Sequence, residues 1–94
     1  MIMRVRVEFL GLHYAIPKSH LEVEFPGETI AHLINHLSKG MKEFRDAVLK
    51  ADGSLDEAVQ VGLNEEEWVT PDRVNETKIR DGDRITFMMM AGGG

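Results

Sequence analysis

The stretch that decides the fold is Arg84-Ile85-Thr86-Phe87-Met88-Met89-Met90, followed by Ala91-Gly92-Gly93-Gly94. Its first part alternates in side-chain character and predicts a mostly buried strand. Because glycine has little conformational restraint, residues 91–94 are expected to form a flexible tail after a domain of residues 1–90. Four residues reach at most about 14 Å, at roughly 3.4 Å each, far enough to enter a partner's active site. Such a tail presents one chemical group, the α-carboxylate of Gly94.

Composition limits the class of protein. The 94 residues suffice for one domain with one modest core. The absence of cysteine excludes disulfides, thiolate zinc sites and cysteine nucleophiles in this chain. A net charge of −5 argues against nucleic acid and anionic membrane surfaces as partners, and allows a basic protein partner. Neither a membrane span nor a signal peptide is evident, so we expect a soluble cytoplasmic protein.

The first quarter of the chain predicts a β-hairpin, and a helix follows it. Apolar residues alternate with charged ones over residues 3–9 and again over residues 21–25, which is typical of half-buried strands. Thr29 is the expected N-cap of a helix whose apolar residues recur at i, i+3, i+4 and i+7. Lys39 and Gly40 are expected to end this helix, with the glycine at the C′ position.

The remainder of the chain predicts a shorter helix over residues 41–51, a strand over residues 59–63 and a brief edge strand at residues 68–69. A tight turn at residues 81–83 leads into the last strand. A hairpin, a helix and a C-terminal strand suit an α+β fold with a mixed sheet and a helix packed on one face. In this β-grasp arrangement the last strand lies parallel to the first, in the centre of the sheet.

The whole chain resembles the ubiquitin-like sulfur carriers. It is most similar to the small subunit of molybdopterin synthase (MoaD-type), and next to the sulfur carrier of thiamine synthesis (ThiS-type). The segments that carry the resemblance are Pro26-Gly27-Glu28-Thr29, Val59-Gln60-Val61-Gly62-Leu63-Asn64, Asp81-Gly82-Asp83 and the terminal Ala91-Gly92-Gly93-Gly94. The second helix favours the molybdopterin type, because the thiamine-type chain is shorter there.

Two features depart from the pattern of these carriers. The family commonly has a proline between the last strand and the glycines, where this chain has Met88-Met89-Met90. The chain also ends in three glycines where the family has two. The reactive carboxylate therefore belongs to Gly94, unless the tail is trimmed to Gly93.

The resemblance implies a chemistry for the tail. A carboxylate has a pKa of roughly 3.3–3.7 and is a poor electrophile when ionised, so it must first be adenylated. The implied partners are an E1-like adenylating enzyme that uses ATP, a sulfur donor protein and the large subunit of molybdopterin synthase, which receives the thiocarboxylate. Gly93 and Gly94 would enter its channel, with Gly92 and Ala91 lining the mouth. No cofactor is expected on this chain itself.

Other functions remain open at this point. The activated carboxylate could serve a thiamine-pathway carrier, or it could join a lysine, as in a ubiquitin-like protein modifier. Alternatively, the tail could be idle in a non-covalent β-grasp adaptor, or be only a disordered end or an expression remnant. Met88 and Met90 are expected to form an adaptable docking patch on the sheet face opposite the helix, although a loop could instead bury them.

Several polar groups are given structural interpretations. His32 and His36 have a spacing that can hold zinc, but they face away from the apolar stripe and are expected to be solvated. The run Glu65-Glu66-Glu67 could meet a basic partner, but a solvated loop is the favoured interpretation. Trp68 is expected to serve core or edge packing. The aspartates lack the spacing of a calcium-binding loop.

Overall fold

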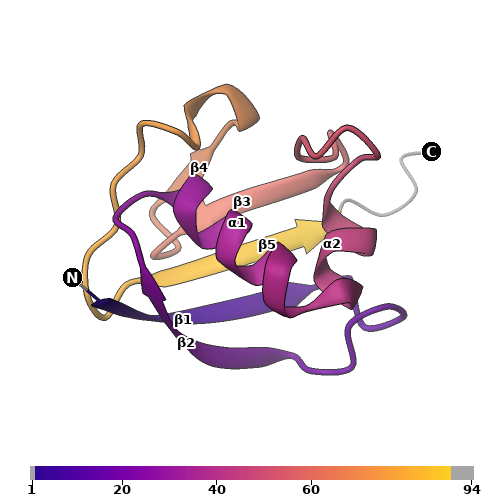
Figure 1. Ribbon diagram of the computed structural model, residues 1–94, viewed down its shortest axis with the longest axis horizontal. Coiled ribbons are helices and arrows are strands. Elements are labelled where there is room, and N and C mark those ends of the chain that lie inside the picture. The colour runs from indigo at the N-terminus through magenta and orange to yellow at the C-terminus, as the bar shows by residue number, and fades with distance from the viewer. Residues whose placement is uncertain (1, 90–94) are drawn as a thin grey trace.

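The computed structural model describes residues 2–89, which form a five-stranded mixed sheet with two helices on one face (Figure 1). The strand order is β2-β1-β5-β3-β4. In chain order the elements are β1 (Ile2–Leu10), β2 (His20–Pro26), α1 (Ile30–Gly40), α2 (Lys42–Val48), β3 (Val59–Leu63), β4 (Glu67–Val69), the 3-10 helix η1 (Pro71–Arg73) and β5 (Arg84–Met89).

Strand β5 lies in the centre of the sheet. It pairs in parallel with β1, with Phe87 beside Phe9, and antiparallel with β3, with Phe87 beside Val61. The first and last strands of the described chain are therefore neighbours (Figure 1). This arrangement confirms the expected β-grasp fold.

The core lies between this sheet and the helices. Alternate residues of the central strands point into it, and Val7, Ile85 and Phe87 have no exposed surface. Phe44 of α2 contacts Phe87 edge-on, with ring centroids 5.0 Å apart, and also lies 6.1 Å from the ring of Phe9. Such aromatic pairs contribute about 0.5–1.5 kcal/mol each beyond the burial of their surface. Because Phe9 and Phe87 face α2, the helices cover the same side of the sheet that the alternation predicts.

Connecting segments add core residues that periodicity did not reveal. Leu12 and Ile16 in the β1–β2 connection, Leu55 before β3 and Ile79 before β5 are all buried. The connection after β1 was predicted only as a turn. A single apolar residue in an irregular segment has no repeat to mark it, so its burial is decided by where the loop folds back.

The N-terminus of α1 is held by a reciprocal pair of hydrogen bonds. As predicted, Thr29 is the N-cap, and its hydroxyl accepts a hydrogen bond from the backbone N–H of His32 at 3.2 Å. The ring nitrogen Nδ1 of His32 in turn accepts from the N–H groups of Glu28 at 3.1 Å and Thr29 at 3.4 Å. The side chain of His32 is exposed, as expected, but it also has this capping role, which its spacing in the sequence did not predict.

The end of α1 and the length of α2 differ from prediction. Gly40 is the last helical residue and has no positive φ, so the predicted C′ glycine is wrong. Met41, in an extended conformation, both ends α1 and precedes α2. Helix α2 stops at Val48 and does not extend to residue 51, because Leu49 bridges to Leu55 and draws the chain into a tight turn.

Side chains at the start of β5 join three segments of the fold. Gly82 has φ +89, as the predicted turn at residues 81–83 requires. The carboxylate of Asp81 accepts from the N–H of Arg4 at 2.8 Å. Asp83 accepts from the side-chain amide of Asn64 at 3.0 Å, and the Asn64 oxygen accepts from the N–H of Arg84 at 2.8 Å. These bonds set the position of β5 relative to β1 and β3.

We predict that Thr29→Ala lowers the free energy of unfolding by about 1 kcal/mol, because the first turn of α1 loses its side-chain acceptor. His32→Ala should also destabilise the protein, by less, since the backbone N–H groups it caps can turn to water. The matched control is His32→Glu, which keeps an acceptor at the third helical position and should retain stability. Urea unfolding of the four proteins measures the differences. Equal stability of wild type and Thr29→Ala would contradict the capping role.

Candidate functional site

The predicted site residues divide into a described and an undescribed part. Met90, Ala91, Gly92, Gly93 and Gly94 lie outside the described residues, so the prediction of a flexible, reactive tail stays a prediction. Met88 lies within the described chain, one residue before the end of β5 at Met89.

Met88 belongs to the sheet face that the helices do not cover. It lies between Leu10 of β1 and Gln60 of β3 in the strand register, and its side chain is half-buried. Leu10 is 50% exposed although its neighbours on the same face of β1 are charged. The first strand was predicted to end at residue 9, so Leu10 was not assigned to this face. The signal was the continued alternation, which puts Leu10 on the same face as Arg4, Arg6 and Glu8.

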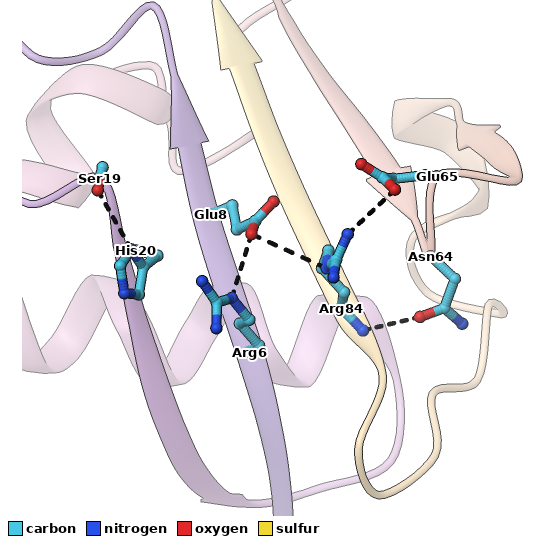
Figure 2. Close-up of polar contacts among 7 residues, drawn as sticks. All are labelled: Arg6, Glu8, Ser19, His20, Asn64, Glu65 and Arg84. Carbon is cyan, nitrogen blue, oxygen red and sulfur yellow. Dashed lines mark hydrogen bonds and ion pairs between the residues drawn. The ribbon is translucent and has the colours of Figure 1, made fainter.

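A row of ion pairs crosses the same face of the sheet, closer to the start of β5 than Leu10 and Met88 are. Figure 2 shows the carboxylate of Glu8 between Arg6 and Arg84, with nitrogen–oxygen distances of 3.1 Å and 3.8 Å. Arg84 also reaches Glu65, at 3.0 Å. Farther along β1, the hydrogen bond from Arg4 to Glu24 raises the pKa of the Arg4 guanidinium. Exposed pairs of this kind contribute little to stability, so they mainly fix where charge lies on the face.

A groove of about 300 Å³ opens next to this row, at the β4 side of the sheet. Trp68 of β4 lies opposite Gly62 of β3. The indole ring of Trp68 lies over Gly62, and a Cβ added to Gly62 would be 3.4 Å from the nearest ring carbon. Trp68 was expected in core or edge packing; it lies on the edge strand β4 and is 56% exposed, so it is not a core residue. The groove is lined by Glu8, Leu10, Gly62, Glu65, Glu66, Glu67, Trp68 and Thr86.

The end of β5 is held by close contact with the β1–β2 connection. Gly11 has φ +72, and a Cβ at this position would come within 2.9 Å of the carbonyl oxygen of Met89. A side chain would therefore collide with backbone at the last described residue of the strand. Only glycine fits both the conformation and the space, so the loop packs closely against the Met89 carbonyl.

The two histidines with zinc-ligand spacing make structural contacts. No group of three or more histidine and acidic side chains within residues 2–89 could hold a metal ion. His36 contacts the ring of Phe25 at 6.1 Å between centroids, and His32 caps α1. No helix in this part of the chain is long and apolar enough to cross a membrane.

Comparison with known families matches residues 7–94 to the ThiS family. The chain belongs to the ThiS family. The resemblance to ubiquitin-like sulfur carriers is thereby confirmed. A search of curated proteins found no match.

Solved structures share the ThiS-family fold along almost the whole chain. SAMP1 from Haloferax volcanii superposes with a TM-score of 0.80 at 17% identity, covering 97% of this chain and 99% of that one. A Pyrococcus furiosus protein described as a candidate molybdopterin converting factor, subunit 1, gives 0.69 at 22% identity, covering 95% and 99%. A chain of the Amycolatopsis orientalis BexX/CysO complex gives 0.70 at 23%, covering 96% and 99%. At these identities the likeness shows the fold alone.

We predict that Gly11→Ala lowers the free energy of unfolding by about 1–3 kcal/mol, because the new Cβ combines a left-handed backbone with the contact to Met89. Gly40→Ala is the matched control. It lies at the end of α1, where an added Cβ would meet nothing within 4 Å, and it should stabilise the protein by about 0.5–1 kcal/mol. Chemical unfolding of both variants measures the difference. A neutral Gly11→Ala would show that the loop does not hold the end of β5.

Proposed function

We propose that this ThiS-family protein is a sulfur carrier that bears a thiocarboxylate on Gly94. The observation that supports it best is the position of β5. The strand lies in the centre of the sheet, beside β1 and β3, and the sequence passes from its end at Met89 into Met90-Ala91-Gly92-Gly93-Gly94. A firmly held strand followed after two residues by three glycines suits a carboxylate that must enter a partner's narrow active site.

The chemistry begins with activation of that carboxylate. An oxygen of the ionised Gly94 carboxylate attacks the α-phosphorus of ATP on an E1-like partner, and pyrophosphate leaves. Hydrosulfide, delivered by a sulfur donor protein, then attacks the carbonyl carbon. The bond from that carbon to the AMP oxygen breaks, and AMP leaves with the electron pair. The tail has then exchanged one oxygen for sulfur.

The proposed acceptor is the large subunit of molybdopterin synthase, which would use the sulfur for a pterin precursor. Helix α2 and the tight turn that follows it support the molybdopterin type over the shorter thiamine type. The likeness to the Pyrococcus furiosus protein points in the same direction. Gly93 and Gly94 would occupy the acceptor's channel, and Ala91 and Gly92 its mouth.

A second candidate is a ubiquitin-like protein modifier. The fold likeness to SAMP1, called a small archaeal modifier protein, favours it. Activation is the same in both cases, and only the acceptor differs, a lysine amine taking the place of hydrosulfide. Covalent adducts of this chain on other proteins would support the modifier.

Docking of the partners is proposed to use the apolar end of the open sheet face. Leu10 and Met88 are adjacent in the register and lie at the end of the sheet where β5 finishes. Together with Met90 they would form an adaptable apolar contact next to the tail. Such a contact supplies the binding free energy needed to order the tail in the partner.

The carrier proposal is tested by intact mass spectrometry after incubation with an E1-like activating enzyme, ATP and a sulfur donor. We expect a mass gain that matches replacement of one oxygen by sulfur. Deletion of Gly93 and Gly94 should abolish the gain, because the reactive end is lost, and the unfolding free energy should stay the same. The variant Gly40→Ala keeps the tail and should gain the same mass as wild type. Failure of wild type under conditions that load an established carrier would overturn the proposal.

Docking is tested with two single variants, each of which replaces an apolar side chain by a polar one at one end of the open face of β1. Leu10→Gln should raise the KM of the activating enzyme for the carrier about tenfold, with kcat little changed, because burial of one large apolar side chain contributes about 1.5–3 kcal/mol. Ile2→Gln is the control, since Ile2 is 59% exposed on the same face at the opposite end of β1. Equal effects of the two substitutions would contradict a localised docking patch.

A further inference from the structure

We infer that the groove beside Trp68 binds an arginine side chain of a partner protein. The groove lies on the open sheet face, between the β4 edge and the ion-pair row of Glu8 and Arg84. It combines an exposed aromatic surface, an accessible hydroxyl and an excess of carboxylates. An arginine has complementary groups for all three.

The aromatic wall is the indole of Trp68. One part of the ring lies over Gly62, where an added Cβ would be 3.4 Å from it, and Trp68 is still 56% exposed. Leu10 provides a second apolar surface on the groove, and it is 50% exposed. An arginine can stack its planar guanidinium on an indole and lay its methylene groups along apolar surface.

The floor of the groove offers a hydroxyl with unused hydrogen-bonding capacity. Thr86 of β5 is only 8% exposed, and it lines the groove between Glu8 and Gly62 in the strand register. The side-chain hydrogen bonds formed within residues 2–89 do not include its oxygen. Every fully buried side-chain nitrogen and oxygen in that part of the chain has a partner, so the Thr86 oxygen must keep some accessible surface. It can accept a hydrogen bond from a guanidinium that enters the groove.

The rim of the groove has more carboxylates than the described basic side chains pair with. Four glutamates line the groove, and Arg84 pairs with two of them, Glu8 and Glu65. Glu66 and Glu67 form no ion pair with any other described residue. A solvated loop was the favoured interpretation of this run in the sequence, and both side chains are indeed exposed. Their position beside an open indole instead favours a cationic ligand.

Arginine fits these groups better than lysine does. A guanidinium presents five donors in a plane, so it can stack on Trp68 while it donates to Thr86 and to a rim carboxylate. An ammonium is a strongly hydrated point charge and would lose more of its hydration on the indole.

The arginine site does not require the tail chemistry. The arginine inference can therefore fail while the sulfur-carrier proposal succeeds, and the sulfur-carrier proposal can fail while the arginine inference succeeds.

Trp68 is the only tryptophan of the chain, so its fluorescence reports on the groove directly. The full-length protein is titrated with an acetylated and amidated peptide, Ala-Leu-Arg-Leu-Ala, and with the same peptide carrying neutral citrulline in place of arginine. We expect a saturable fluorescence change with the arginine peptide. The citrulline peptide should bind about threefold to tenfold more weakly.

Three variants test the contacts. The double substitution Glu66→Gln and Glu67→Gln should weaken the arginine peptide about threefold to tenfold, and Thr86→Val, which keeps the side chain's shape, should weaken it about twofold or more. The double substitution Glu43→Gln and Glu76→Gln changes the net charge equally at exposed sites away from the groove and should leave binding unchanged.

The inference is overturned by any of four results. These are no saturable change, equal affinity for the citrulline peptide, equal affinity for a lysine peptide, or equal weakening by the two double substitutions. The last result would show a general effect of net charge and not a site. Folding of each variant is checked by chemical unfolding, so that loss of binding is read only from folded protein.

Discussion

The pairing of β5 between β1 and β3 is the constraint on which the rest of the structure depends. The strand is hydrogen-bonded along both edges, in parallel on one side and antiparallel on the other. Its alternate side chains Ile85 and Phe87 are fully buried against the helices. A shift of one residue would turn these side chains to solvent and bring Thr86 and Met88 into the core, so the register is strongly specified.

Fixing that register also divides the sheet into two faces with different roles. The covered face holds the aromatic cluster of Phe9, Phe44 and Phe87. The open face carries the ion pairs of Glu8 and Arg84 (Figure 2). It also carries the apolar residues Leu10 and Met88 and the groove beside Trp68. The proposed docking patch and the proposed arginine site therefore lie on the same face of the sheet.

The candidate site could be predicted only in part. The open face was correctly predicted for Met88, because alternation in a strand assigns each residue to a face, whatever its neighbours are. Trp68 and Glu8 were not grouped, because they line one groove only through the pairing of β4 with β3, β3 with β5 and β5 with β1. His32 was considered only as a metal ligand or a solvated residue. Its capping role depends on side-chain rotation toward the backbone, which residue spacing does not reveal.

The sequence by itself determined the strands, the first helix with its Thr29 cap, the central place of the last strand and the family resemblance. The strands and the capped helix follow from local repeats and turn chemistry, which are properties of neighbouring residues. The central place of the last strand follows from the rules for connecting such elements. The resemblance rests on short segments shared with a known family. Only the tertiary structure decided that Leu12, Ile16 and Ile79 complete the core, that α2 stops at Val48, and that Gly11 must be a glycine. It alone also assembled the groove around Trp68. Each of these depends on contacts between segments distant in the chain, whose distances are set by packing of the whole fold and not by the order of residues along it.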